Sequence, residues 1–162
     1  MTPTQLVRLA TVVIVGLLWI GLGQDLLFQN LLADLFAGPG VTLGTLFQSA
    51  VNPAFHALWV ACIIGALIWF WMTYKTRPSG AQQAVTIGSR WWWTIALVNL
   101  FLGWALMAGF LHNEPIPASG WLTLLIFVVI DVVICFWLPT LMATPRTFRL
   151  VVPGAVNFLG DR

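Results

Sequence analysis

Charged side chains are scarce in this sequence, and their scarcity decides its broad class. Only 7% of the 162 residues are Asp, Glu, Lys or Arg, whereas a soluble domain carries about 25%. Hydrophobic residues make up 60% of the chain, and the mean hydropathy is +0.94. Such a chain cannot present a polar surface on all sides, so we predict an all-α protein that is embedded in a membrane.

The chain also lacks the residue clusters that indicate several common activities. Seven basic and five acidic residues give a formal charge of +2 without any basic run, so nucleic acid is not expected as a partner. Cys62 and Cys135 lie in separate apolar segments without CxxC spacing, which favours buried free thiols over a disulfide or a zinc site. No Ser/His/Asp or Cys/His group falls on one side of the expected membrane, so we do not expect an enzyme.

Four apolar segments approach the roughly 20 residues that a membrane-spanning helix needs. The predicted spans cover approximately residues 9–28, 54–74, 91–111 and 121–142. Between the first two spans lies an outer segment, residues 24–53, whose first part repeats leucines at helical spacing with polar residues on other faces. This pattern predicts an amphipathic helix that extends the first span or lies in the membrane interface, and that ends at Gly38-Pro39-Gly40.

The distribution of basic residues predicts the sidedness of these spans. With four spans, all basic residues fall on one side, in the N-terminal lead, the loop 75–90 and the tail 143–162. They are Arg8, Lys75, Arg77, Arg90, Arg146, Arg149 and Arg162. Because basic residues of short loops stay in the cytoplasm, we expect both termini, the loop and the tail to be cytoplasmic in a bacterial inner membrane.

One carboxyl, Asp131, falls near the middle of the last span. A charge there costs roughly 2.5–3.5 kcal/mol on the insertion scale, so the group must find a partner within the protein. Asn99 lies at a matching depth in the third span, which predicts a hydrogen-bonded pair of Asn99 and Asp131 between antiparallel neighbours. We interpret this pair as a polar clasp between helices, with a proton or cation site as the alternative.

Two further features of the spans are candidates for binding or packing. His56 and His112, near the outer ends of the second and third spans, could ligate a haem b between two helices, although haem ligands usually lie deeper. Ala57, Ala61 and Gly65 form a small-residue stripe that would allow close helix packing. The ten tryptophans mainly mark span ends, as in an interfacial belt. Deeper ones could contact core, lipid, a neighbouring chain or a pigment.

The architecture is similar to that of known small membrane proteins, but no family motif accompanies it. Four spans with both termini inside resemble the small membrane subunit of tripartite periplasmic transporters, whose acidic-arginine motif is absent after the first span. The small multidrug exporters also have four spans, but their glutamate lies in the first helix, where this chain has no acid before Asp25. We therefore assign no family on sequence alone.

The sequence thus predicts a multi-pass, tryptophan-rich subunit of a membrane complex, without catalytic activity. Its expected partners are membrane lipid and other integral membrane subunits, and no cofactor is expected. The first alternative is a small proton- or cation-coupled transporter or channel that uses Asp131. The second is a haem- or quinone-binding membrane anchor.

Overall fold

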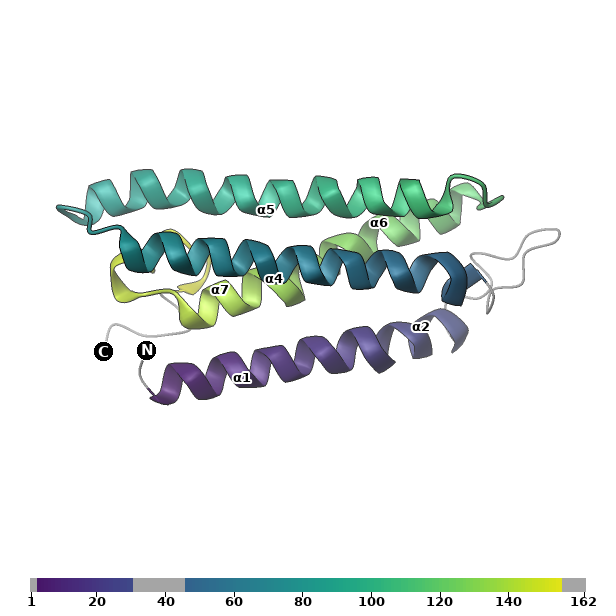
Figure 1. Ribbon diagram of the computed structural model, residues 1–162, viewed down its shortest axis with the longest axis horizontal. Coiled ribbons are helices and arrows are strands. Elements are labelled where there is room, and N and C mark those ends of the chain that lie inside the picture. The colour runs from purple at the N-terminus through teal and green to yellow at the C-terminus, as the bar shows by residue number, and fades with distance from the viewer. Residues whose placement is uncertain (1–2, 31–45, 156–162) are drawn as a thin grey trace.

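The structure is a computed structural model that describes residues 3–30 and 46–155. Within these ranges the chain is all-helical and contains no strand. The elements in chain order are α1 (Pro3–Leu18), η1 (Trp19–Gly23), α2 (Gln24–Asn30), η3 (Phe47–Val51), α4 (Asn52–Lys75), α5 (Ala81–Leu111), α6 (Ala118–Val132), η4 (Val133–Trp137), α7 (Leu138–Ala143) and η5 (Arg146–Phe148). Figure 1 shows them as an elongated bundle of roughly parallel rods.

Three of these rods are long and apolar enough to cross a membrane, as in a multi-pass membrane protein. They cover Phe47–Lys75, Ala81–Leu111 and Ala118–Ala143. Each contains one of the predicted spans, but α5 begins at Ala81, so most of the loop that we predicted over residues 75–90 is helical. The packing offers a reason: Ala84 and Gly88 are small and buried on an otherwise polar first part of α5, and the chain beyond α7 packs against Gly88.

The first rod runs alongside the other three and consists of α1, η1 and α2 joined without a break (Figure 1). Its apolar stretch, Val13–Leu27, is shorter than the three spans, so a fourth span is not established by length and composition. The predicted amphipathic helix is also not established. As far as Asn30, the chain continues the first rod, and residues 31–45 lie outside the described part of the chain.

Helix α5 approaches α4 and α6 closely because glycines face side chains across both contacts. A Cβ at Gly65 would come within 2.5 Å of Asn99 Nδ2, and a Cβ at Gly103 within 2.6 Å of Val128 Cγ1. Of the predicted small-residue stripe, Gly65 is therefore at a tight contact, whereas Ala57 and Ala61 are only half-buried. Without water to drive association, such close backbone approach is a main source of helix packing in membranes.

After α7 the chain turns back over the end of the bundle. Phe148 and Val151 cover Gly88 of α5, and both are buried. Trp69 and Trp92 are also buried here, and their indole N–H groups donate to the hydroxyls of Thr144 at 2.9 Å and of Thr140 at 3.1 Å. The beginning of the predicted cytoplasmic tail, up to residue 155, is therefore packed against the bundle.

Candidate functional site

The candidate site is the carboxyl of Asp131, which is buried with a relative exposure of 1%. The indole Nε1 of Trp19 donates to one carboxyl oxygen at 2.7 Å. The amide Nε2 of Gln24 donates to both oxygens, at 2.7 and 2.8 Å. Two side chains of the first rod thus hold the acid of the last one, which explains how a carboxyl can lie within an apolar bundle.

A π-helical turn makes this arrangement possible. In a regular α-helix, residues five apart differ by about 140° around the axis, so Trp19 and Gln24 would lie on different faces. In η1 the backbone N–H of Gln24 bonds instead to the carbonyl of Trp19, which is the five-residue hydrogen bond of a π-helix. The wider turn brings both side chains onto the face that meets Asp131.

A second π-helical turn lies on the acid's own rod. Asp131 is the last residue but one of α6, and η4 begins at Val133. One turn before the acid, the ring of Phe127 stacks on the indole of Trp19, with centroids 6.0 Å apart and planes at 13°. The Trp19 ring is therefore fixed both by a hydrogen bond at its edge and by stacking on its face.

One polar atom of the site has no partner. Gln24 is fully buried, and its Oε1 makes no hydrogen bond within the described structure. A buried acceptor without a donor costs about 1–3 kcal/mol. The Gln24 amide therefore donates through Nε2 to the acid, and its Oε1 remains an acceptor without a donor. A water, a proton donor or a small cation has the chemistry to satisfy this oxygen.

Asn99 lies at the level of Asp131 but contacts a different helix. Gly103 faces Val128 across the antiparallel pair of α5 and α6, so residues one turn further along each helix, Asn99 and Asp131, are at similar depth. The Asn99 amide nitrogen nevertheless has no hydrogen-bond partner and packs against Gly65 of α4. The hydrogen bonds that the structure shows to Asp131 come from Trp19 and Gln24 instead.

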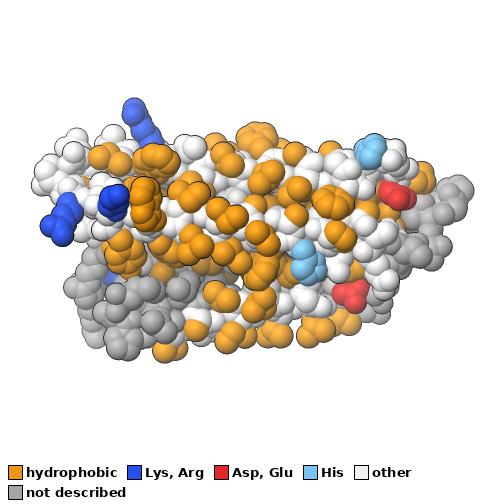
Figure 2. All heavy atoms as spheres, in the orientation of Figure 1, with side chains coloured by type: hydrophobic (Ala, Val, Ile, Leu, Met, Phe, Trp, Pro, Cys, Tyr) orange, Lys and Arg blue, Asp and Glu red, His pale blue; other side chains and the backbone are white. Residues whose placement is uncertain are grey.

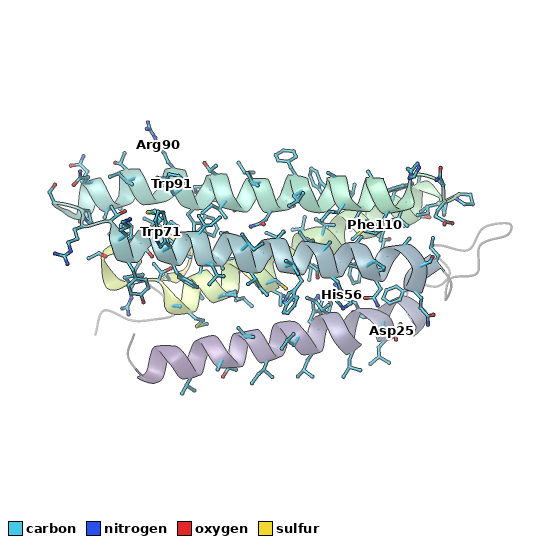
Figure 3. All side chains as sticks on the ribbon, viewed as in Figure 1. Asp25, His56, Trp71, Arg90, Trp91 and Phe110 are labelled. Carbon is cyan, nitrogen blue, oxygen red and sulfur yellow. The ribbon has the colours of Figure 1, made fainter. Side chains whose placement is uncertain are left out.

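The two histidines are exposed and bond to their own helices. His56 Nδ1 lies 2.8 Å from the carbonyl oxygen of Asn52, and His112 Nδ1 lies 2.9 Å from that of Gly109. Figure 3 shows His56 near Asp25 at one end of the bundle. An exposed ring beside solvent or headgroups lacks the cover that a haem requires, so this geometry adds no support for the haem alternative. Haem or quinone binding stays a prediction.

The cysteines behave as the sequence indicated. Cys62 and Cys135 are both buried and free. Cys135, one turn after Asp131, lines an apolar cavity of ≈170 Å³ between the first rod, α4 and α7. Among the described residues, no group of three or more His, Cys, Asp or Glu side chains could hold a metal ion.

Sequence reasoning missed Trp19 and Gln24, the two donors of the site. In the sequence, Trp19 is typical of an indole that faces lipid or the core. Gln24 is typical of a polar residue at the start of an outer helix. The signal that could have found Gln24 is its place directly after the uncharged run Leu9–Gly23. There an amide falls at membrane depth if the helix simply continues.

Comparison of the chain with models of protein families, with curated proteins and with solved structures found no match, so its function must be argued from its own geometry.

Proposed function

We propose that this protein is a non-catalytic integral membrane subunit that packs within, or stabilises, a larger membrane complex. The observation that carries the proposal is the pairing of Asp131 with Trp19 and Gln24. Asp131, in the middle of the last rod, accepts hydrogen bonds from two donors of the same chain. Its use is then to fix the first rod against α6, as expected of a structural clasp.

The outward faces of the bundle support the same proposal. Only 28% of the most apolar stretch of Ala81–Leu111 is buried within the chain. Its outward face carries large apolar side chains, including Leu97, Val98 and Phe101, at 46–60% exposure. Such a surface has to be covered by lipid or by helices of other subunits.

The proposed location is a bacterial inner membrane with the basic end of the bundle in the cytoplasm. Among the described residues, Lys75, Arg77 and Arg90 lie near the turn between α4 and α5, and Glu114 follows the far end of α5. Figure 2 shows basic side chains at one end of the bundle and acidic side chains toward the other. Basic residues of short loops favour the cytoplasmic side. A cysteine introduced by Ser79→Cys, at an exposed turn position, is expected to react with an impermeant maleimide only in inverted vesicles. Reaction in intact cells would contradict this sidedness.

A second candidate function is proton- or cation-coupled transport through Asp131. Two observations favour it: the unpartnered Gln24 Oε1 next to the acid, and the π-helical turns η1 and η4 on the two rods that meet there. Such turns occur frequently at functional sites. In this case the complex would be an oligomer of this chain, because four rods alone enclose a narrow path.

Asp131→Asn separates the two candidates. The substitution places an amide N–H where the donors of Trp19 and Gln24 converge, so the clasp loses at least one hydrogen bond. If the protein is a subunit, native gels of mild-detergent extracts are expected to show it with other membrane proteins, and the variant with several-fold less complex. Proteoliposomes of either protein then carry no proton flux.

Glu114→Gln is the matched control, because it makes the same change of charge at an exposed helix end. It is expected to leave the complex intact. Flux in wild-type proteoliposomes that Asp131→Asn abolishes, with assembly spared, would replace the subunit proposal by the transporter. Wild-type protein that migrates without any other membrane protein would contradict the subunit proposal directly.

A further inference from the structure

The surface between α5 and the last rod (α6 and η4) contains an apolar groove that Trp19, Gln24 and Asp131 do not line. It has a volume of ≈350 Å³, within the range of about 300–1,000 Å³ that is usual for ligand pockets. Its lining side chains are all apolar or aromatic: Trp92, Trp93, Ala96, Leu97, Leu100, Val129, Val132, Val133, Phe136, Trp137 and Pro153. The groove runs along the outside of two membrane helices, so its occupant comes from within the membrane.

The tryptophans of the groove offer ring surface and few hydrogen bonds. The N–H of Trp92 donates to the hydroxyl oxygen of Thr140, and the N–H of Trp137 donates to the carbonyl oxygen of Pro153 at 3.1 Å. Trp92 and Phe136 lie 5.7 Å apart between ring centroids and form part of the groove's floor. An occupant that makes no hydrogen bonds, such as an acyl chain, fits this lining.

A positively charged side chain, Arg90, lies at one end of the groove. Trp93, Leu97 and Leu100 form one wall at spacings of four and three residues along α5, and Arg90 is three residues before Trp93 on the same stripe. Arg90 is exposed and projects away from the bundle beside Trp91 (Figure 3). Figure 2 shows the acidic side chains of this face toward the opposite end of the bundle.

We propose that this groove binds an anionic phospholipid, with an acyl chain between α5 and α6 and the headgroup phosphate at Arg90. The charge of Arg90 favours an anionic lipid over a second copy of the chain, because a parallel copy would bring its own basic end against this one. Basic side chains next to the membrane favour anionic lipid, by an amount that corresponds to about a fivefold change in affinity per side chain.

The test is native mass spectrometry of the purified protein after exchange into detergent that contains either phosphatidylglycerol or phosphatidylcholine with the same acyl chains. We expect the wild type to retain phosphatidylglycerol at least fivefold better. Arg90→Gln is expected to remove most of this preference. Ala96→Phe is expected to fill the groove and to lower retention of either lipid, because Ala96 is a half-buried part of its lining.

Ala105→Phe is the matched control, because Ala105 is also on α5 but lies outside the groove and is exposed. It is expected to retain lipid as the wild type does. Equal retention of the two lipids by the wild type, or undiminished retention in Ala96→Phe with helicity preserved, would overturn the proposal. A change in the number of protein copies in Ala96→Phe, without a change in bound lipid, would instead assign the groove to a second copy and also overturn it.

Discussion

Asp131→Ala is expected to lower the free energy of unfolding of the bundle by about 2–4 kcal/mol, since it leaves one buried and one half-buried donor without an acceptor at about 1–3 kcal/mol each. Interhelical hydrogen bonds in membranes average about 0.6 kcal/mol and reach about 1.7 kcal/mol, so we expect the lower part of the roughly 2–6 kcal/mol that two unsatisfied donors could cost. The donors are the N–H of Trp19 and the amide of Gln24. Unfolding in mixed micelles with increasing dodecyl sulfate measures the difference.

The control for this prediction is the combined variant Trp19→Phe, Gln24→Leu, Asp131→Leu. Replacing every member of a buried polar cluster by apolar groups of similar size is often close to neutral, because no donor or acceptor is left unsatisfied. We expect its stability to be within about 1 kcal/mol of the wild type. A single Asp131→Ala variant as stable as the wild type would mean that the acid does not hold the first rod.

Gly103→Leu is expected to disrupt the packing of three helices and to destabilise the protein by about 3 kcal/mol, at the upper end of overpacking effects. A Cβ at this position would lie 2.6 Å from Val128 Cγ1 and 3.1 Å from Leu58 Cδ1. Val128 cannot easily move aside, because its branched Cβ restricts χ1 in a helix. The same unfolding titration and the yield of monodisperse protein give the measurement.

Gly109→Leu is the matched control on the same helix. No atom lies within 4 Å of a Cβ built at Gly109, and the residue is exposed. Both variants gain the same intrinsic helix propensity over glycine, about 1 kcal/mol, so the difference between them isolates the packing. If Gly109→Leu were as destabilising as Gly103→Leu, the close contacts at Gly103 would not explain the loss.

The sequence predicts the helices better than it predicts their contacts. Apolar length is a property of a segment, so the spans that include Trp121–Met142 and Ala54–Tyr74 could be found from composition. The start of α5 could not, because its helix includes a polar stretch whose buried Gly88 packs against the returning chain. A polar stretch next to a span is normally a loop, and the packing that overrides this preference involves residues about sixty positions away.

The candidate site was predictable in part for the same reason. The depth of Asp131 and its need for a partner follow from the sequence, and so does the similar depth of Asn99. The choice of partner depends on which face of each rod meets the acid, and regular helical periodicity gives the wrong face for Gln24 relative to Trp19. A π-helical turn is not encoded by any residue type, so the actual donors could be found only from coordinates.

The π-helical turn of η1 has a consequence for how the chain can vary. The turn accommodates one residue more than an α-helix would between Trp19 and Gln24. Deletion of Gly21 would place the two donors four residues apart in a regular α-helix, about 40° around the axis, so both would still face the carboxyl. Substitutions at Gly21, which has open space around it, do not alter the number of residues between the two donors. A chain with one residue more between the donors would instead place them about 120° apart in a regular helix, so inheritance can drop one position here more easily than it can add one.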